Sequence, residues 1–151
     1  MISENKLRHS LGVARTCQQY GKDRGLDEEY CDALFVMGFL HDIGYEKSPD
    51  TNHPSVSFDM ISSFTKHPEM LEAIRVHGKK YENLSVVDEI LNMADLTVSY
   101  NGEPCTVWSR LEGIKEYCGV DSDHYKNAML IVNALGLNEI YSNSLKGGRI
   151  M

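Results

Sequence analysis

The chain has 151 residues, of which 42% are apolar, so it is long enough for one domain with a real core and too short for two comfortable ones. Its formal charge of −7 argues against broad, sequence-independent binding to nucleic acid or to anionic membranes. Charges interrupt the N-terminal segment and no segment reaches the length of a membrane span, so we expect a cytoplasmic protein and read residues 1–151 as a single domain.

The pattern along the chain predicts an all-α fold, because start and stop signals of helices recur while strand alternation is almost absent. The first helix is expected over Asn5–Lys22. Asp27 caps a second helix, expected over residues 28–45, whose inward face carries Ala33, Val36, Met37, Leu40, His41 and Gly44.

About six or seven helices are expected in all. Prolines open two short ones, over residues 56–64 and 68–78, and Ser85 caps another, over residues 86–100. Two more are expected over Thr106–Cys118 and Ser122–Leu135. Four cysteines without CxxC spacing lie in these helical stretches, so we expect reduced thiols rather than disulfides or a zinc ribbon: Cys17, Cys31, Cys105 and Cys118.

The adjacent pair His41-Asp42 is the first candidate for chemistry. Neighbouring side chains on a regular helix diverge by about 100°, but the last turn before a terminating glycine can relax and let both converge. Gly44 follows this pair. A histidine and a carboxylate at one place suit a divalent metal ion.

Further ligands would have to come from other helices, and the candidates are His9, His53, His77 and Asp95. Asp95 lies at the edge of an apolar stripe formed by Val87, Leu91, Ala94 and Val98, where an ionised group is costly unless it is paired or bound to metal. His9 points inward only if the first helix is buried on both flanks. Each of these residues also has a purely structural reading, for example as a helix cap or a core histidine.

The strings RHSLGVARTC, MGFLHDIGYE, NHPSVSFDMI, AIRVHGKK and LNMADLTVSYNGE together resemble the HD superfamily of metal-dependent phosphohydrolases, over residues 6–103. The order H…HD…D is matched by His9, His41, Asp42 and Asp95. Dinuclear branches add two histidines, and His53 and His77 stand where those are expected. The resemblance thus implies a helical HD fold and one or two divalent ions, whether Fe, Mn, Zn, Ni, Co or Mg.

The resemblance also implies the reaction: metal-bound hydroxide attacks phosphorus in a phosphoester or phosphoanhydride, with His41 and Asp42 as catalytic ligands. Many relatives carry lysine directly after HDIG, whereas this chain has Tyr45, which leaves Lys47 as a substitute catalytic lysine. We expect a nucleotide or another small phosphorylated substrate. The compact size resembles enzymes that split symmetrical diadenosine tetraphosphate.

Basic side chains near the ligands are the candidate phosphate contacts, namely Lys79, Lys80 and Arg15, while Arg110 is a candidate partner of an acidic neighbour. Two other functions stay open at this point. The same ligands could form a diiron oxygenase, or the chain could be a ligand-binding module without activity. Neither a membrane nor bulk nucleic acid is an expected partner, and a homodimer is left open.

Overall fold

The computed structural model describes residues 3–42 and 67–137, and these ranges are all-α, as predicted. The described elements are six helices: α1 (Glu4–Asp23), α2 (Glu28–Leu40), α4 (Pro68–Val76), α5 (Val86–Leu96), α6 (Val107–Cys118) and α7 (Asp123–Ala134). Within these ranges the sole β-type pairing is one isolated bridge between Val98 and Pro104. The helix expected over residues 56–64 lies outside the described residues.

Capping side chains start the helices where the sequence predicts. Asp27 accepts a hydrogen bond from the Tyr30 backbone N–H at 2.8 Å, and Thr106 and Ser122 act in the same way at α6 and α7. Ser85 and Asp88 form a complete capping box at α5. Each of these bonds satisfies a backbone donor that the first turn leaves unpaired.

Two helices end four or more residues earlier than the sequence suggested. α2 stops at Leu40, so His41 is its C-cap and Asp42 already lies in a turn. α5 stops at Leu96 rather than at Tyr100, because the chain turns at the β-branched Thr97 and the following residues pair with Pro104 and its neighbours. The early end of α2 releases His41 and Asp42 from the helical divergence of neighbouring side chains.

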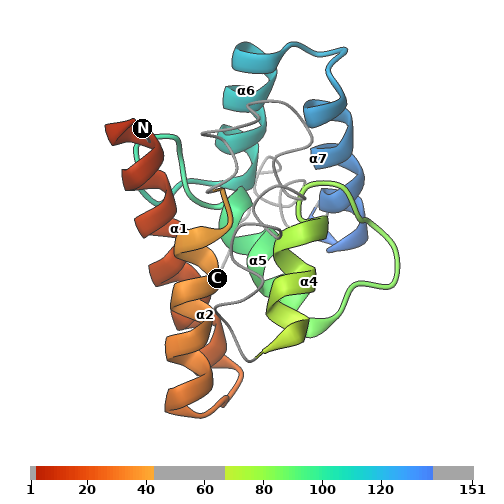
Figure 1. The fold of residues 1–151 in the computed structure, drawn as a ribbon. Helices are drawn as coiled ribbons and strands as arrows, with labels where there is room; N and C mark the ends of the chain where they lie inside the picture. The colour runs from red at the N-terminus through yellow and green to blue at the C-terminus, as the bar shows by residue number, and fades with distance from the viewer. Residues whose placement is uncertain (1–2, 43–66, 138–151) are drawn as a thin grey trace, which may run out of the picture.

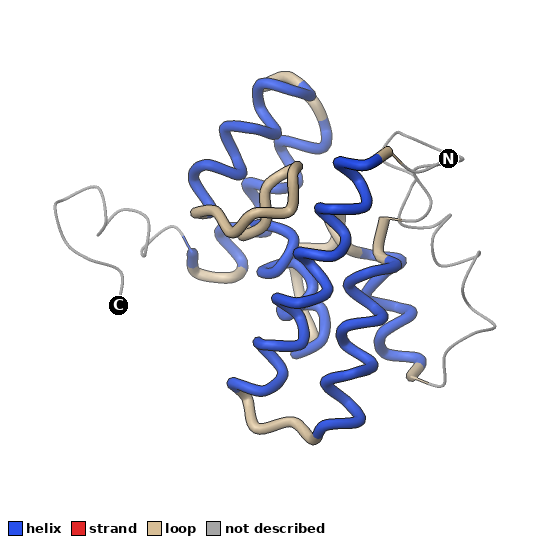
Figure 2. The backbone as a smooth tube through the Cα atoms, turned by 90° about the vertical axis from the view of Figure 1, so that its left-hand side faces the viewer, coloured by secondary structure: helices blue, strands red, loops and turns tan. Residues whose placement is uncertain are grey.

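The helices form two packed groups (Figure 1). α1 and α2 lie side by side, joined by the short loop seen at the bottom of Figure 2, and α4 and α5 complete a core around them. A smaller core joins α6 and α7 to the end of α5 through Leu96. The predicted inward face of α2 was partly wrong, because Val36 is half exposed and the buried residues of that helix are Cys31, Leu34, Met37 and Gly38.

Two glycines allow the close contacts that bring the first helix to its neighbours. A Cβ on Gly38 of α2 would lie 2.8 Å from the Ala14 Cα of α1, which is closer than such atoms approach. Gly102 has a φ of 85° and packs its backbone against the Arg8 carbonyl, so a side chain there would be strained and would clash. α1 is thus fixed between α2 and the loop that follows α5.

None of the described helices is long and apolar enough to cross a membrane. The four cysteines are all free thiols, as expected.

Candidate metal centre

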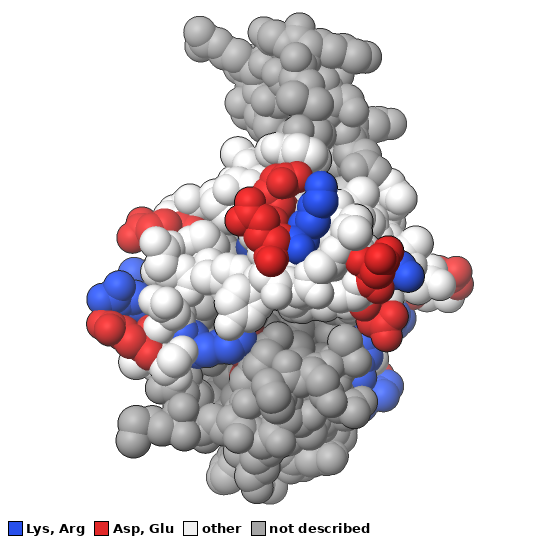
Figure 3. Space-filling view, turned by 90° about the horizontal axis from the view of Figure 1, so that it is seen from above, with Lys and Arg blue, Asp and Glu red and all other residues white. Residues whose placement is uncertain are grey.

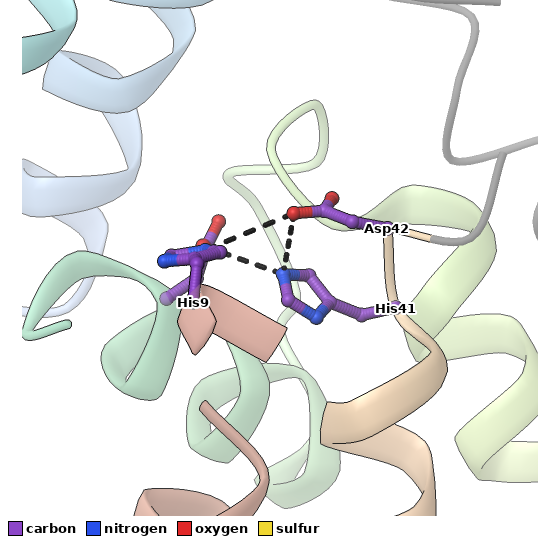
Figure 4. Close-up of side chains that lie close together, drawn as sticks. His9, His41 and Asp42 are labelled. Carbon is purple, nitrogen blue, oxygen red and sulfur yellow. Dashed lines mark hydrogen bonds and ion pairs between the residues drawn. The ribbon is translucent and has the colours of Figure 1, made fainter. Parts of the chain in front are cut away.

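Side chains from α1, the end of α2 and α5 converge at one buried point. One ligand atom each of His9, His41, Asp42 and Asp95 lies within 4.8 Å of all the others. Figure 4 shows the side chains of His9, His41 and Asp42 pointing toward one another. The order H…HD…D in the sequence is therefore a cluster in space, and burial on both flanks of α1 explains why His9 points inward.

The histidine rings of this centre are fixed by backbone carbonyls. The Nδ1–H of His9 donates to the Ser99 carbonyl at 2.9 Å, and that of His41 donates to the Gly38 carbonyl at 2.6 Å. His77, at the end of α4, does the same with the Ile74 carbonyl at 2.6 Å. Because a carbonyl only accepts hydrogen bonds, each Nδ1 carries a proton and the neutral ring keeps a lone pair on Nε2.

These Nε2 atoms face carboxylate oxygens, which also carry lone pairs. The His9 Nε2 lies 2.9 Å from the Asp95 Oδ1, and the His41 Nε2 lies 3.0 Å from the Asp42 Oδ2 and 3.4 Å from the Asp95 Oδ1. The His77 Nε2 lies 3.3 Å from the other oxygen of Asp42. A proton or a metal cation must therefore lie between the rings and the carboxylates.

Charge balance favours a metal cation. A proton on each of the three rings would set three positive charges against two carboxylates in a buried space, whereas one divalent ion balances them. His41 is fully buried, and its Nε2 makes no hydrogen bond of acceptable geometry within residues 3–42 and 67–137. A buried polar atom of this kind needs a ligand.

The two carboxylates strongly favour a positive charge beside them. Burial lowers the pKa of His41, but Asp42 and Asp95 outweigh this effect and raise it to about 10. Burial likewise opposes the ionisation of Asp95, yet His41, His9 and Arg110 hold the pKa of that carboxyl well below its usual range. A divalent ion would neutralise the same carboxylates. Imidazole nitrogens and carboxylate oxygens are suitable ligands for such an ion.

Of the two histidines predicted to bind a second metal ion, the structure describes one. His77 is buried beside Asp42, and its ring centroid lies 5.0 Å from that of His41. His53 lies outside the described residues, as does the catalytic candidate Lys47. Their roles stay predictions.

The predicted phosphate contacts do not gather at the centre. Arg15 is exposed on α1, six residues after His9 and therefore on a different side of the helix. Lys80 lies 3.4 Å from a carboxylate oxygen of Asp88, and Lys79 is partly exposed beside it. The structure shows no contact between these three side chains and the cluster among the residues it describes.

Two other cations stand closer to the cluster, and one was missed in the sequence. Lys6 is partly buried one turn before His9 on α1; burial lowers the pKa of its ammonium, while the nearby carboxylates of Asp42 and Asp95 raise it. Its spacing to His9 is a signal that could have identified it. Arg110 of α6 lies with its Nη2 3.6 Å from the Asp95 Oδ1, in agreement with the expected acidic partner.

Known proteins with similar sequences match this chain over part of its length. Ribonuclease Y of Dehalococcoides mccartyi is 28% identical over 94 residues, which are 61% of this chain and 17% of that protein. Ribonuclease Y of Streptococcus sanguinis is 29% identical over 94 residues, with the same shares. The 3'3'-cGAMP-specific phosphodiesterase 1 of Vibrio cholerae is 40% identical over 48 residues, 32% of this chain and 11% of that protein.

The chain thus spans only about a sixth of the length of the ribonucleases that it matches. No solved structure is significantly similar to it. The HD domain matches residues 7–99, a segment that contains His9, His41, Asp42, His77 and Asp95. With the family's residues together in space and its sequence pattern over more than half of the length, this chain belongs to the HD domain family.

Proposed function

We propose that this chain is a metal-dependent phosphohydrolase that cleaves a phosphoester or phosphoanhydride in a nucleotide or a related small phosphorylated metabolite. The observation that carries the proposal is the set of imidazole Nε2 atoms that face two carboxylates with their Nδ1 atoms held by backbone carbonyls. When bound, a divalent ion would activate water and neutralise phosphoryl oxygens.

The protein's own residues would hold and orient that ion. His9 and His41 cannot turn away, because their Nδ1–H groups are engaged by Ser99 and Gly38. Asp95 is the most open of the four ligand side chains, with 20% of its surface exposed, so substrate would approach from its side. These features support a pre-organised site with one accessible edge.

Asp42 would contribute to the binding of two ions. Its Oδ2 lies near His41 and His9, while its Oδ1 lies 3.3 Å from the His77 Nε2. A second ion would be held by Asp42 and His77. That second site is part of the proposal.

The formal charge of −7 supports a small substrate over a polymeric nucleic acid. On the described part of the face shown in Figure 3, acidic and basic side chains are interspersed and form no basic patch. The names of the relatives, a ribonuclease and a cGAMP phosphodiesterase, support cleavage of phosphodiester bonds in general. We propose a cytoplasmic enzyme that acts on a small phosphoester.

The test is a hydrolysis screen with the whole chain loaded in turn with Mn²⁺, Zn²⁺ or Fe²⁺. Nucleotides, dinucleoside polyphosphates, cyclic dinucleotides and bis-p-nitrophenyl phosphate are the substrates. We expect turnover of at least one class, reduced about 100-fold or more in Asp42→Asn. The matched control is Asp32→Asn, because Asp32 lies on α2, ten residues before Asp42, but is exposed and bonded to Gln18.

Turnover with the redox-inert Zn²⁺ would exclude the diiron oxygenase reading. A wild-type chain that holds its metal and hydrolyses none of these substrates would refute the proposal. Equal loss of activity in Asp32→Asn would show that the effect is not specific to the cluster.

A further inference from the structure

α6 lies beyond the segment that the HD domain matches, yet it places one charged group at the edge of the cluster. Arg110 is only 6% exposed, and its guanidinium lies over the Tyr100 ring at 4.6 Å. The Nε–H donates to the Asp95 backbone carbonyl at 3.0 Å, and Nη2 lies 3.6 Å from the Asp95 Oδ1. α6 thus contributes to the same site as α1, α5 and the end of α2.

One nitrogen of this guanidinium has no partner in the described part of the chain. The Nη1 of Arg110 is buried and makes no hydrogen bond there. A guanidinium carries five N–H donors in a rigid plane, and a buried donor left without an acceptor is costly. The contacts with Asp95 are already made by Nε and Nη2, so stabilising Asp95 does not explain the position of Nη1.

A second cation approaches the cluster from α1. Lys6 is partly buried on α1, one helical turn before His9, and the carboxylates of Asp42 and Asp95 raise the pKa of its ammonium against the lowering effect of burial. The two carboxylates of the cluster would be neutralised by one divalent ion. Lys6 and Arg110 would then keep positive charge beside the loaded site, which suits a phosphoryl dianion.

We propose that Arg110 and Lys6 form the subsite that binds the phosphoryl oxygens of the substrate, next to the metal cluster. Arg110 supplies a planar donor group that fits phosphate, and Lys6 supplies a point charge on a flexible stem. This inference rests on the proposed function, since it assigns the part of the substrate that the site must hold.

Binding of inorganic phosphate to the Mn²⁺-loaded whole chain tests the subsite without any turnover. Titration calorimetry would compare wild type with Arg110→Met, Arg110→Lys and Lys6→Met, and elemental analysis would give the metal content of each protein. Arg24→Met is the matched control, because Arg24 is an exposed arginine at the far end of α1.

We expect Arg110→Met to bind phosphate about 10- to 100-fold more weakly, because a hydrogen bond to a charged group is lost. Lys6→Met should also weaken binding, and Arg110→Lys should be intermediate, since it keeps the charge but not the planar donors. Metal content should stay at the wild-type level in all three variants, and Arg24→Met should bind phosphate as wild type does.

The proposal is overturned if phosphate affinity is unchanged in variants that keep their metal, or if Arg110→Met and Arg110→Lys both lose the metal, which would make Arg110 a positioning residue for Asp95 only. If Arg110→Met does not fold, Arg110→Lys and Lys6→Met decide the question. Tight phosphate binding without hydrolysis of any substrate would refute the proposed function and leave the subsite standing. Hydrolysis with an unchanged KM in the variants would refute the subsite alone.

Discussion

Replacing Gly38 with alanine should damage both the packing of α1 on α2 and the metal centre. The added Cβ would lie 2.8 Å from the Ala14 Cα, 3.0 Å from the Ala14 N and 3.0 Å from the Val13 O. All three are backbone atoms, so no side chain can rotate away and the helices must separate. The Gly38 carbonyl also holds the His41 ring, which would move with it.

The expected magnitude is the difference between two opposing effects. Alanine stabilises a helix interior by about 0.5–1 kcal/mol relative to glycine, whereas overpacking costs about 1–3 kcal/mol. We expect a net loss of about 1–2 kcal/mol for Gly38→Ala, which lowers Tm by about 2–8 °C in a chain of this size. Metal affinity should fall about 10-fold, because His41 loses its support.

The matched control is Gly113→Ala in α6, where the nearest atom to an added Cβ is a Tyr100 ring carbon at 3.7 Å. That variant should gain about 0.5–1 kcal/mol through helix propensity. Urea denaturation of the metal-free proteins measures both changes. If Gly38→Ala were stabilised as much as Gly113→Ala, the close packing of α1 on α2 described above would be refuted.

Two further predictions concern the supports of α4. Asn92 is buried, accepts a hydrogen bond from the Gly78 N–H at 3.1 Å and donates one to the Asp88 carbonyl at 2.8 Å. Asn92→Ala should therefore lower the free energy of unfolding by about 1–3 kcal/mol, as measured by urea denaturation. A change below about 0.5 kcal/mol would contradict this prediction. The Tyr30 hydroxyl donates to Glu69 at 2.7 Å and is the main cause that lowers the pKa of this carboxyl, so Tyr30→Phe should lose a few tenths of a kcal/mol at pH 7, discounted for exposure.

The sign of the pH effect follows from the lowered pKa of Glu69. Its contribution is fully present above the ordinary glutamate pKa of about 4.3 and is lost as the pH falls through the lowered value. The stability difference between wild type and Tyr30→Phe should therefore close on acidification. A difference that widens below about pH 4 would contradict the assignment.

Much of the fold could be predicted from local signals. Asp27, Ser85, Thr106 and Ser122 begin helices as expected, and the apolar stripe beside Asp95 is buried as expected. These features depend on residues within one or two turns of each other. Short-range capping and periodicity therefore predict them without tertiary information.

The ends of helices were harder to predict, since tertiary contacts compete with the local pattern. α5 continues in sequence as an apolar stripe through Val98, yet it stops at Leu96 because the next residues pair across the turn with residues 103–105. Val36 fits the inward period of α2 but is half exposed, because α1 covers a different side of that helix. Spacing alone does not say which flank a neighbouring helix will cover.

The candidate metal ligands could be predicted from the sequence, whereas their contact with Arg110 could not. His9, His41, Asp42 and Asp95 were found through their pattern, and the structure brings them together. Arg110 contacts Asp95 because α6 and α7 pack against the end of α5. No local sequence pattern predicts this contact. The single-domain organisation and the cytoplasmic location remain predictions.

Metal binding by the cluster is the central claim, and titration calorimetry of the metal-free chain with Mn²⁺ and Zn²⁺ measures it most directly. We predict that the wild-type chain binds at least one ion and that His41→Ala loses this binding. At a free-metal concentration 100 times Kd, the free energy of unfolding of the wild-type protein should rise by about 2.7 kcal/mol. His67→Ala, which removes a histidine at the start of α4 that contacts Tyr30, should bind as wild type does. A wild-type chain that takes up no ion, or a His41→Ala variant that binds as tightly as wild type, would contradict the account.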